Sequence, residues 1–419
     1  MARRKKVLIS GAGVAGPALA WWLNRFGFEP SIVEISPQFR TGGYMVDFWG
    51  KGFDLIEQMG LLPEVKRSGY HIREVRFVHA DGSRAGGFST DGFWRATNGR
   101  FTSLPRSDLA RIIWQALPSS MEARFGDEVT RLEPDGDAVR VHFARSEAKT
   151  YDLVIGADGL HSKVRQLVFG PEDRFETFLG YAFAAFTVVG YGPRTTDTYM
   201  GHGVPGRHAS RVSMRDDRTL ILLIWRDESS SLPSTDEGRR ALLKRRFAGM
   251  GWECDRMLEA LDGATDLYLD SISQIHIPRW SDGRVGLVGD AAWAPSFLAG
   301  EGCGLGIMGA YVLAGELARS GGDPLAFARY ESRLRAFIET KQRMATRFGG
   351  AFCPSTRFGL IFRNWVASLL NVGPIANWAL SRELKDDVEL PHYKAAATGS
   401  EPHENVGGEE RNNVAHVRS

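Results

Sequence analysis

The sequence has few cysteines, few prolines and no long apolar run. Cysteine occurs only three times in 419 residues, at Cys254, Cys303 and Cys353, and no pair is spaced as C-x-x-C. The sequence therefore predicts neither a dithiol redox centre nor a zinc knuckle, and we expect no metal site. Thiols this sparse are typical of a protein that works in a reducing cytoplasm. No run of 18 apolar residues occurs, so we expect no stable insertion into a membrane.

An excess of one charge sign is also missing. Lysine and arginine together number 52, aspartate and glutamate 50, and the formal net charge is +2. Proteins that bind nucleic acid usually carry a clear basic excess, so we expect no nucleic-acid partner. The content of 43% hydrophobic and 24% charged residues is ordinary for a globular protein. At about 150 residues per domain, the length predicts two or three domains.

Glycine, in contrast, is abundant. It occupies 48 of 419 positions, whereas the average usage is about 7%. The glycines show no G-X-Y period and prolines number only 18, which excludes a collagen-like or low-complexity chain. Eight glycines fall within residues 283–309 and three more form a turn near the start. Because glycine lets the backbone turn sharply or approach a ligand, we interpret the surplus as partly cofactor architecture.

The first glycine turn lies in residues 6–34, which follow the order strand, turn, helix, strand. The turn fits G-x-G-x-x-G, with glycines at Gly11, Gly13 and Gly16. The first lets the chain turn off the strand, the second lets backbone N–H groups approach a pyrophosphate, and the third lets the helix pack on the sheet. The N-terminus of the helix would then hold the anion. The alternative is a glycine-rich turn that binds no ligand.

Glu34 ends the second strand, 18 residues after the last glycine of the turn. An acid at this position accepts the two hydroxyls of an adenosine ribose. It disfavours a ribose 2′-phosphate, so the turn is better suited to FAD or NAD than to NADP.

Two more apolar strands end in a glycine next to an acid. Asp158 lies in Gly156-Ala157-Asp158-Gly159, and Asp290 lies in Gly289-Asp290-Ala291-Ala292, which precedes the glycine-rich segment 300–304. Each alone has the alternative of an ordinary turn, since Asp-Gly is common in turns. Three such sites after buried-strand patterns, in this order, are much harder to obtain by chance.

With these three sites, the sequence resembles the FAD-dependent aromatic hydroxylases, the single-component flavoprotein monooxygenases typified by para-hydroxybenzoate hydroxylase. The resemblance covers roughly residues 6–350 and looks closest to tetracycline-modifying and actinobacterial tailoring monooxygenases. It implies an α/β fold, with a Rossmann-like FAD-binding domain, an inserted β-sheet substrate domain and C-terminal helices. It also implies that NAD(P)H reduces FAD, that O₂ then adds, and that a flavin hydroperoxide hydroxylates an aromatic or polycyclic small molecule.

The resemblance implies a domain organisation in which the chain crosses between two domains. The expected ranges are 1–70, 106–175 and 281–350 for FAD binding, 71–105 and 176–280 for the substrate domain, 351–393 for C-terminal helices that bridge the domains, and 394–419 for a tail. The tail has no aromatic residue, leucine or isoleucine, so we expect it to be disordered.

The resemblance also assigns cofactor contacts. Asp158 would touch both FAD and the nicotinamide cofactor, and Asp290 would bind the ribityl or pyrophosphate side of FAD. Arg106 matches the FAD-binding arginine, for which a charge-assisted bond to phosphate is suitable. For Arg106 and Arg40 the alternative is a surface salt bridge. The other expected cofactor-binding residues are Gly11, Gly13, Gly16, Glu34, Arg40, Asp47, Val129, Gly300, Gly302, Cys303 and Gly304.

Three residues of the segment after Asp290 depart from the family pattern. Trp293 stands where the family has histidine or tyrosine, Phe297 follows Pro-Ser where a second proline is common, and Glu301 replaces a common glutamine. We expect these changes to affect the substrate and the tuning of the flavin more than FAD binding itself.

The substrate is expected between the flavin and the sheet of the second domain. Candidate wall residues are Phe183, Phe186, Met200, Met214, Trp225 and Phe297. Most of them have the alternative of plain core, since alternate positions on any sheet face a core. His202 is the one candidate for deprotonating a phenol, with a surface histidine as the alternative. The hard chemistry belongs to the cofactor, so no side-chain nucleophile is required.

Only the G-x-G-x-x-G match at residues 11–16 joins a predicted strand to a predicted helix in a strand-helix-strand unit, so we expect NADPH or NADH to bind transiently, without a domain of its own. The protein is expected to be a monomer or a homodimer. A halogenase is disfavoured because W-x-W-x-I-P is missing. A flavin-dependent reductase or oxidase of a lipophilic substrate and a non-catalytic flavin-binding sensor stay open as alternatives.

Overall fold

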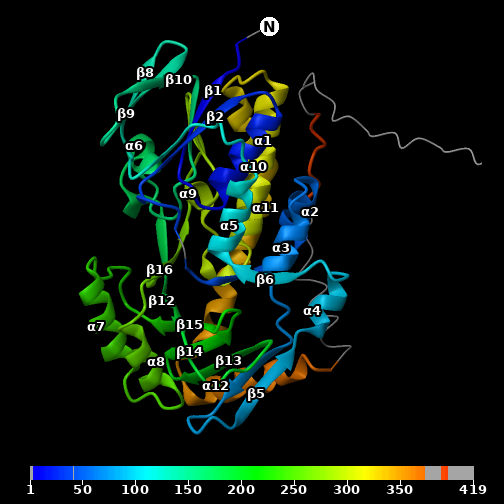
Figure 1. Cartoon of the computed structure of the whole chain (residues 1–419), viewed down its shortest axis with the longest axis vertical. Coiled ribbons are helices and arrows are strands. Elements are labelled where there is room, and N and C mark those ends of the chain that lie inside the picture. The colour runs from blue at the N-terminus through cyan, green and yellow to red at the C-terminus, as the bar shows by residue number, and fades with distance from the viewer. Residues whose placement is uncertain (1–2, 41, 373–387, 395–419) are drawn as a thin grey trace, which may run out of the picture.

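The chain folds around two large sheets at opposite ends of an elongated molecule (Figure 1). The computed structural model describes residues 3–40, 42–372 and 388–394. Residues 395–419, nearly all of the predicted disordered tail, lie outside the described residues. The long helix α11 (Leu325–Phe352) begins beside the first sheet and extends to the second (Figure 1). The α/β fold class predicted from the sequence is confirmed.

The first large sheet has six strands in the order β17-β18-β11-β1-β2-β7, all parallel except for β17. The central strands are continuous runs of buried apolar residues, as expected for a parallel sheet covered by helices on its faces. From β1 the chain adds β2 on one side, and it later adds β11 on the other side. The strands are β1 (Lys6–Ser10), β2 (Glu29–Glu34), β7 (Ala123–Phe125), β11 (Leu153–Gly156), β17 (Ser281–Asp282) and β18 (Val285–Leu287).

The second large sheet has seven strands in the order β16-β12-β15-β14-β13-β4-β5, antiparallel except where β13 meets β4. One face packs against α7 (Asp236–Phe247) and α8 (Cys254–Leu261) around Trp225 and Phe247. The other face points toward the first sheet. The strands are β4 (Glu74–Val78), β5 (Arg84–Ser89), β12 (Glu176–Val189), β13 (Thr198–Val204), β14 (Arg207–Ser213), β15 (Arg218–Arg226) and β16 (Tyr268–Ile275).

Smaller elements connect and cover these sheets. The small strands are β3 (Met45–Phe48), β6 (Thr102–Pro105), β8 (Val129–Asp135), β9 (Ala138–Phe143) and β10 (Lys149–Tyr151). The remaining helices are α1 (Ala15–Arg25), α2 (Gly50–Gln58), α3 (Leu62–Ser68), α4 (Asp91–Ala96), α5 (Arg106–Gln115), α6 (Lys163–Phe169), η1 (Glu172–Arg174), α9 (Asp290–Trp293), η2 (Phe297–Ala299), α10 (Gly302–Arg319) and α12 (Arg357–Leu369). Within the described ranges, every helix is too short or too polar to cross a bilayer.

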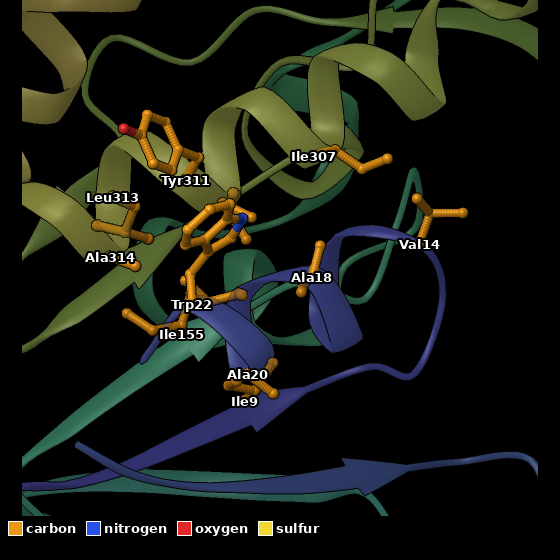
Figure 2. Close-up of a cluster of buried hydrophobic side chains, with 14 of the residues drawn as sticks. Ile9, Val14, Ala18, Ala20, Trp22, Ile155, Ile307, Tyr311, Leu313 and Ala314 are labelled. Atoms are coloured by element: carbon orange, nitrogen blue, oxygen red, sulfur yellow. The ribbon is translucent and has the colours of Figure 1, made fainter. Parts of the chain in front are cut away.

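Helices α1 and α10 pack closely over the first sheet (Figure 2). Trp22 of α1 meets Tyr311 of α10 edge to face, with ring centroids 4.7 Å apart. At Gly306 of α10, a Cβ would already be in contact with the Cβ of Ala15, 3.4 Å away, so little room is left for a larger side chain. On α2, a Cβ at Gly52 would lie 2.5 Å from the Cα of Gly304. Part of the glycine surplus therefore serves helix packing.

A buried ion pair fixes the start of α10 to α11. The Nζ atom of Lys341 lies 2.6 Å from Oε2 of Glu301, and the two side chains are only 7% and 15% exposed. Glu301 is one of the three departures from the family pattern, and in the fold its carboxylate is paired with an ammonium group. A buried pair of this kind depends strongly on both partners, because one charge left without the other pays the full cost of desolvation.

We expect Lys341→Met to destabilise the protein by about 3–5 kcal/mol, because the Glu301 carboxylate loses its cation in a buried setting. The matched control is the double variant Lys341→Met/Glu301→Gln, which removes both charges and should recover most of the loss. Urea unfolding of the three proteins measures the difference. Equal losses in the single and double variants would contradict the importance of the pair.

Candidate functional site

A cavity of about 1710 Å³ lies between the two large sheets. Its wall is built at one end by turns that follow strands of the first sheet and at the other end by β4, β13, β14 and α12. Sites for small molecules are usually about 300–1,000 Å³. The cavity therefore has room for a dinucleotide and a second molecule.

Four sequence-predicted residues meet at one edge of the first sheet. Gly11 follows β1, Glu34 ends β2, Asp158 follows β11 and Asp290 follows β18, and all four line the cavity. The carboxyl ends of parallel strands lie at the same sheet edge, and ligands bind there beside the strand from which the sheet is built in both directions. Here that strand is β1.

The three glycines of the first turn have different surroundings. Gly11 has φ +108°, and a Cβ there would lie 2.5 Å from the carbonyl oxygen of Ala157. A Cβ at Gly16 would lie 2.0 Å from the carbonyl oxygen of Gly11. Gly13 instead faces the cavity, and the nearest atom to its Cβ position is Nη2 of Arg106, 3.8 Å away. Gly11 and Gly16 thus hold the turn together, and Gly13 leaves space in front of it.

Helices α1 and α10 both begin at the cavity. Their N-cap residues are Val14 and Glu301, and neither of these two side chains accepts a capping hydrogen bond from the first turn of its helix. The first backbone N–H groups of a helix and its dipole then favour an anion. Two uncapped helix starts at one cavity are well suited to phosphate groups.

Arg106 is the cation beside these helix starts. Its neighbours Tyr44, Cys303 and Asp290 favour the charged guanidinium, and the pKa of Arg106 is raised chiefly by Tyr44. No carboxylate oxygen in the described part of the chain forms an ion pair with it. The alternative of a surface salt bridge therefore fails for Arg106. It fits Arg40 better, since that side chain is 67% exposed and lies 3.5 Å from Glu34.

The four carboxylates predicted to bind the cofactor differ in what they already bind. Glu34 accepts hydrogen bonds from the backbone N–H groups of Ala12, at 2.8 Å, and Ser36, at 2.9 Å. Asp158 accepts from Val164 N at 3.1 Å and from Ser162 Oγ at 2.5 Å, so it supports the first turn of α6, whose N-cap residue is Ser162. Asp47 accepts from Ser103 Oγ at 2.5 Å.

Asp290 is different, because no hydrogen bond to its carboxylate occurs within the described ranges. Burial raises the pKa values of Asp47, Asp158 and Asp290 above the ordinary value. Among these acids, Asp290 has the most capacity left for hydroxyl groups of a ligand. The cation, the open glycine and this acid are together the donor and acceptor set that a flavin dinucleotide needs.

The other predicted cofactor residues divide into two groups. Val129, Gly300, Gly302 and Cys303 line the cavity. Gly304 does not, because it packs against α2, and this corrects its predicted role. Burial raises the pKa of the Cys303 thiol to about 11, so the group is neutral at physiological pH. The loop before α10 is strained at Ser296, a non-glycine residue with φ +91° whose hydroxyl accepts from Leu298 N. Such strain is characteristic of functional loops.

Four aromatic rings form a cluster where the two ends of the cavity meet. Phe297 stacks on Phe183, with centroids 4.2 Å apart, and meets Tyr44 edge to face at 4.9 Å. Tyr268 packs against Phe183 at 5.5 Å. Phe297, Tyr44 and Tyr268 line the cavity, and Phe183 lies directly behind them. Phe297, one of the departures from the family pattern, is thus held in place by its neighbours.

Several predicted substrate residues face away from the cavity. Phe186 and Trp225 point to the opposite face of the sheet, into the core with α7 and α8, because strand residues alternate between faces. Met214 packs in a separate small core. These three predicted residues do not line the cavity, whereas Met200 does.

The position of His202 also argues against its predicted role as a base. Its ring is only 5% exposed, and its nitrogens lie 2.9 Å from the carbonyl oxygen of Val78 and 3.1 Å from that of Met250. It does not line the cavity. The imidazole therefore ties β13 to its neighbours.

Sequence reasoning missed a chain of polar groups at the cavity wall. Tyr268 donates to Asp270 at 2.7 Å, and His161 contacts Asp270 at 3.0 Å and Glu172 at 2.8 Å. These bonds, first that to Asp270, raise the pKa of His161 to about 10. The signal available in the sequence was His161 itself, three residues after Asp158 in the second glycine-acid motif.

We expect His161→Asn to be less stable than wild type by about 1 kcal/mol at pH 6, because the half-exposed imidazolium is paired with two carboxylates. The pKa is raised in the folded state, so this stabilisation is complete below the unfolded value of about 6.5 and is lost as the pH rises through about 10. Chemical unfolding at both ends of that range measures it. A deficit that is independent of pH would show that the folded protein holds a neutral imidazole.

Comparisons with known proteins agree with this geometry. The family model described as FAD binding domain matches residues 4–341. A flavin-dependent monooxygenase of Legionella longbeachae is 31% identical over 359 residues, which cover 84% of this chain and 90% of that protein. A flavin-dependent monooxygenase of an unknown prokaryotic organism is 33% identical and covers 82% of this chain and 89% of its own length.

Solved structures are similar over nearly the whole length. Tetracycline destructase Tet(51) superposes with a TM-score of 0.79 at 30% identity, covering 93% of this chain and 100% of that one. HpxO of Klebsiella pneumoniae, solved with FAD and uric acid, has a TM-score of 0.74 at 22% identity, covering 91% and 97%, which shows a shared fold. The family match and the relatives above 30% identity therefore establish that this chain belongs to the FAD binding domain family and is a FAD-dependent monooxygenase.

Proposed function

We propose that the protein hydroxylates an aromatic or polycyclic small molecule with NAD(P)H and O₂. One oxygen atom enters a C–H bond of the substrate, and the other leaves as water, which takes up the equivalent of the hydride of NAD(P)H (two electrons and one proton) and one further proton. The observation that carries the proposal is the continuity of one cavity from the first glycine turn to the aromatic rings of the second sheet. A cofactor held at the first end and a flat substrate at the other would meet beside the cluster of Tyr44, Phe297 and Tyr268.

For FAD, we propose that Gly13 and the start of α1 face the pyrophosphate, that Arg106 pairs with a phosphate, and that Glu34 and Asp290 accept from hydroxyl groups. When bound, the flavin supplies the transfer of electrons and the activation of oxygen. Asp47, Asp158, Val129 and residues 300–303 complete the contacts.

The protein's own contribution is positioning and exclusion of water. The aromatic rings of Phe297, Tyr44 and Tyr268 line the cavity, and Phe183 packs behind them. By excluding water, such a wall limits side reactions of reactive intermediates and strengthens nearby electrostatic interactions. Backbone N–H groups at the start of α10 would stabilise negative charge at the flavin edge.

The nicotinamide cofactor would bind transiently, because the chain has one glycine turn of the dinucleotide type. The domain division given above, a cytoplasmic location and a monomeric or homodimeric state belong to the same proposal. One similar structure is named a tetracycline destructase and another was solved with uric acid bound, and both names support a ring-shaped substrate.

We expect Gly13→Ala to weaken FAD binding and Gly16→Ala to lower the stability of the fold. Alanine at 13 meets only an ordinary contact at 3.8 Å, so apo stability should change by less than about 0.5 kcal/mol while FAD affinity falls. Alanine at 16 would push against the Gly11 carbonyl at 2.0 Å and should cost at least about 1–3 kcal/mol of stability. Thermal unfolding of the apoprotein and FAD titration separate the two. Unchanged FAD affinity in Gly13→Ala would contradict its assignment.

Oxygen uptake tests the reaction. Purified holoenzyme with NADPH or NADH is given a panel of phenols and polycyclic aromatics, and we expect substrate-dependent O₂ consumption with a product 16 mass units heavier. Reduction of a substrate double bond without O₂ consumption would favour the reductase alternative. A flavin-loaded protein with no turnover across the panel would favour a sensor.

A further inference from the structure

The far end of the cavity carries two basic side chains that the reaction does not use. They are His208 on β14 and Arg363 on α12. Aromatic and apolar side chains surround them, and the wall there includes Val75, Phe77, Phe88, Phe93, Tyr199 and Phe362.

His208 faces the cavity because of its place in the sheet. It is paired with Gly203, and its ring lies over Gly201, where a Cβ would be 2.7 Å from its Cε1 atom. The side chain is buried, with 7% exposure, and its Nδ1 atom has no hydrogen-bond partner among the described residues. Burial lowers the pKa of His208 to about 3, so the imidazole is neutral.

A buried nitrogen without a hydrogen bond is costly, and most buried polar atoms have a partner. His208 lines the cavity, where a ligand can provide a polar partner for its imidazole ring. A neutral imidazole has one N–H donor and one acceptor nitrogen.

Arg363 provides a positive charge beside His208. Its guanidinium lies 4.1 Å from the ring centre of Phe77, which also packs edge to face on His208 with centroids 6.2 Å apart. It donates to Asn364 Oδ1 at 2.9 and 3.1 Å and to the Phe352 carbonyl oxygen at 3.3 Å. Guanidinium has five N–H donors, so donors are left for a ligand.

The charge of Arg363 is not balanced nearby. Burial lowers its pKa to about 10, which still leaves it charged at neutral pH, and the ionisable neighbour that opposes this shift is the Cys353 thiol. The ionisable neighbours of His208 are Arg363 and His202, which are both basic. In the part of the chain that the structure describes, no carboxylate forms an ion pair with Arg363.

We propose that His208 and Arg363 bind an anionic oxygen of the substrate, a phenolate, an enolate or a carboxylate attached to a flat ring system. Arg363 supplies the charge, the His208 N–H donates a hydrogen bond, and the surrounding rings hold the apolar body. This inference rests on the proposed function, because it narrows the substrate class of the same cavity.

Binding to oxidised holoenzyme, measured by calorimetry, tests the proposal without turnover. The probes are hydroxynaphthoquinone, an enolate at neutral pH, with its methyl ether, and naphthoate with its methyl ester. We expect at least one anion to bind wild type about tenfold or more tightly than its neutral partner, as is typical of charge-assisted hydrogen bonds. Which pair shows the preference distinguishes an enolate or phenolate from a carboxylate.

The variants assign the preference to residues. Arg363→Met should abolish it while affinity for the ether and ester stays within about twofold, and Arg363→Lys should keep part of it. His208→Leu should weaken anion binding about tenfold, and His208→Asn should recover part because its amide can donate. Ser210→Ala is the matched control on the same strand and cavity face, and it should keep the preference.

Flavin absorbance checks that each variant still holds FAD. Equal binding of anion and neutral partner to wild type, or a preference that persists in Arg363→Met, would overturn the inference. Failure of the proposed function would instead appear as missing O₂ uptake in a protein that still prefers the anion. If His208→Leu does not fold, the lysine and methionine variants of Arg363 still decide the outcome.

Discussion

The site depends on one close backbone contact, between the start of α1 and the turn that precedes it. A Cβ at Gly16 would overlap the carbonyl of Gly11, and a Cβ at Gly11 would overlap the carbonyl of Ala157 after β11. Because these two positions carry no side chain, the backbone of the turn passes close to the ends of β1 and β11. That placement directs the uncapped start of α1 at the cavity and brings Glu34 and Asp158 to its edge. Bulkier residues would separate the strand ends from the helix.

A second packing constraint holds the opposite wall of the cofactor end. Helix α10 approaches α1 and α2 through glycines, and the Glu301–Lys341 ion pair fixes its start to α11. The loop before it is strained at Ser296 and carries Phe297, which stacks on Phe183 of the second sheet. The loop therefore connects the two halves of the molecule. A shift in the position of α10 would therefore also move Phe297 and the aromatic rings that pack against it.

The sequence predicted the parts of the site that rest on local patterns. A strand, a glycine turn and an acid are neighbours along the chain, so Gly11, Glu34, Asp158 and Asp290 could be placed without coordinates. The sequence could not predict which face of the second sheet a given side chain occupies, because that depends on the register of the strands. His202 is paired with Ala209 and points into the helix-covered core, whereas His208 is paired with Gly203 and points into the cavity. Arg363 reaches the same wall from a distant helix, and no local pattern indicates that.

The charge at the far end of the cavity bears on how a substrate lies. The cofactor end holds the acids Asp158 and Asp290 together with the cation Arg106, whereas the ionisable neighbours of His208 at the far end are both basic. An anionic oxygen of the substrate is therefore attracted to Arg363, since charges in a water-poor cavity interact strongly. If the oxygen lies at Arg363, the ring body must extend back toward Phe297 and Tyr44. The charge pattern would then present a ring carbon, and not the acidic oxygen, to the cofactor.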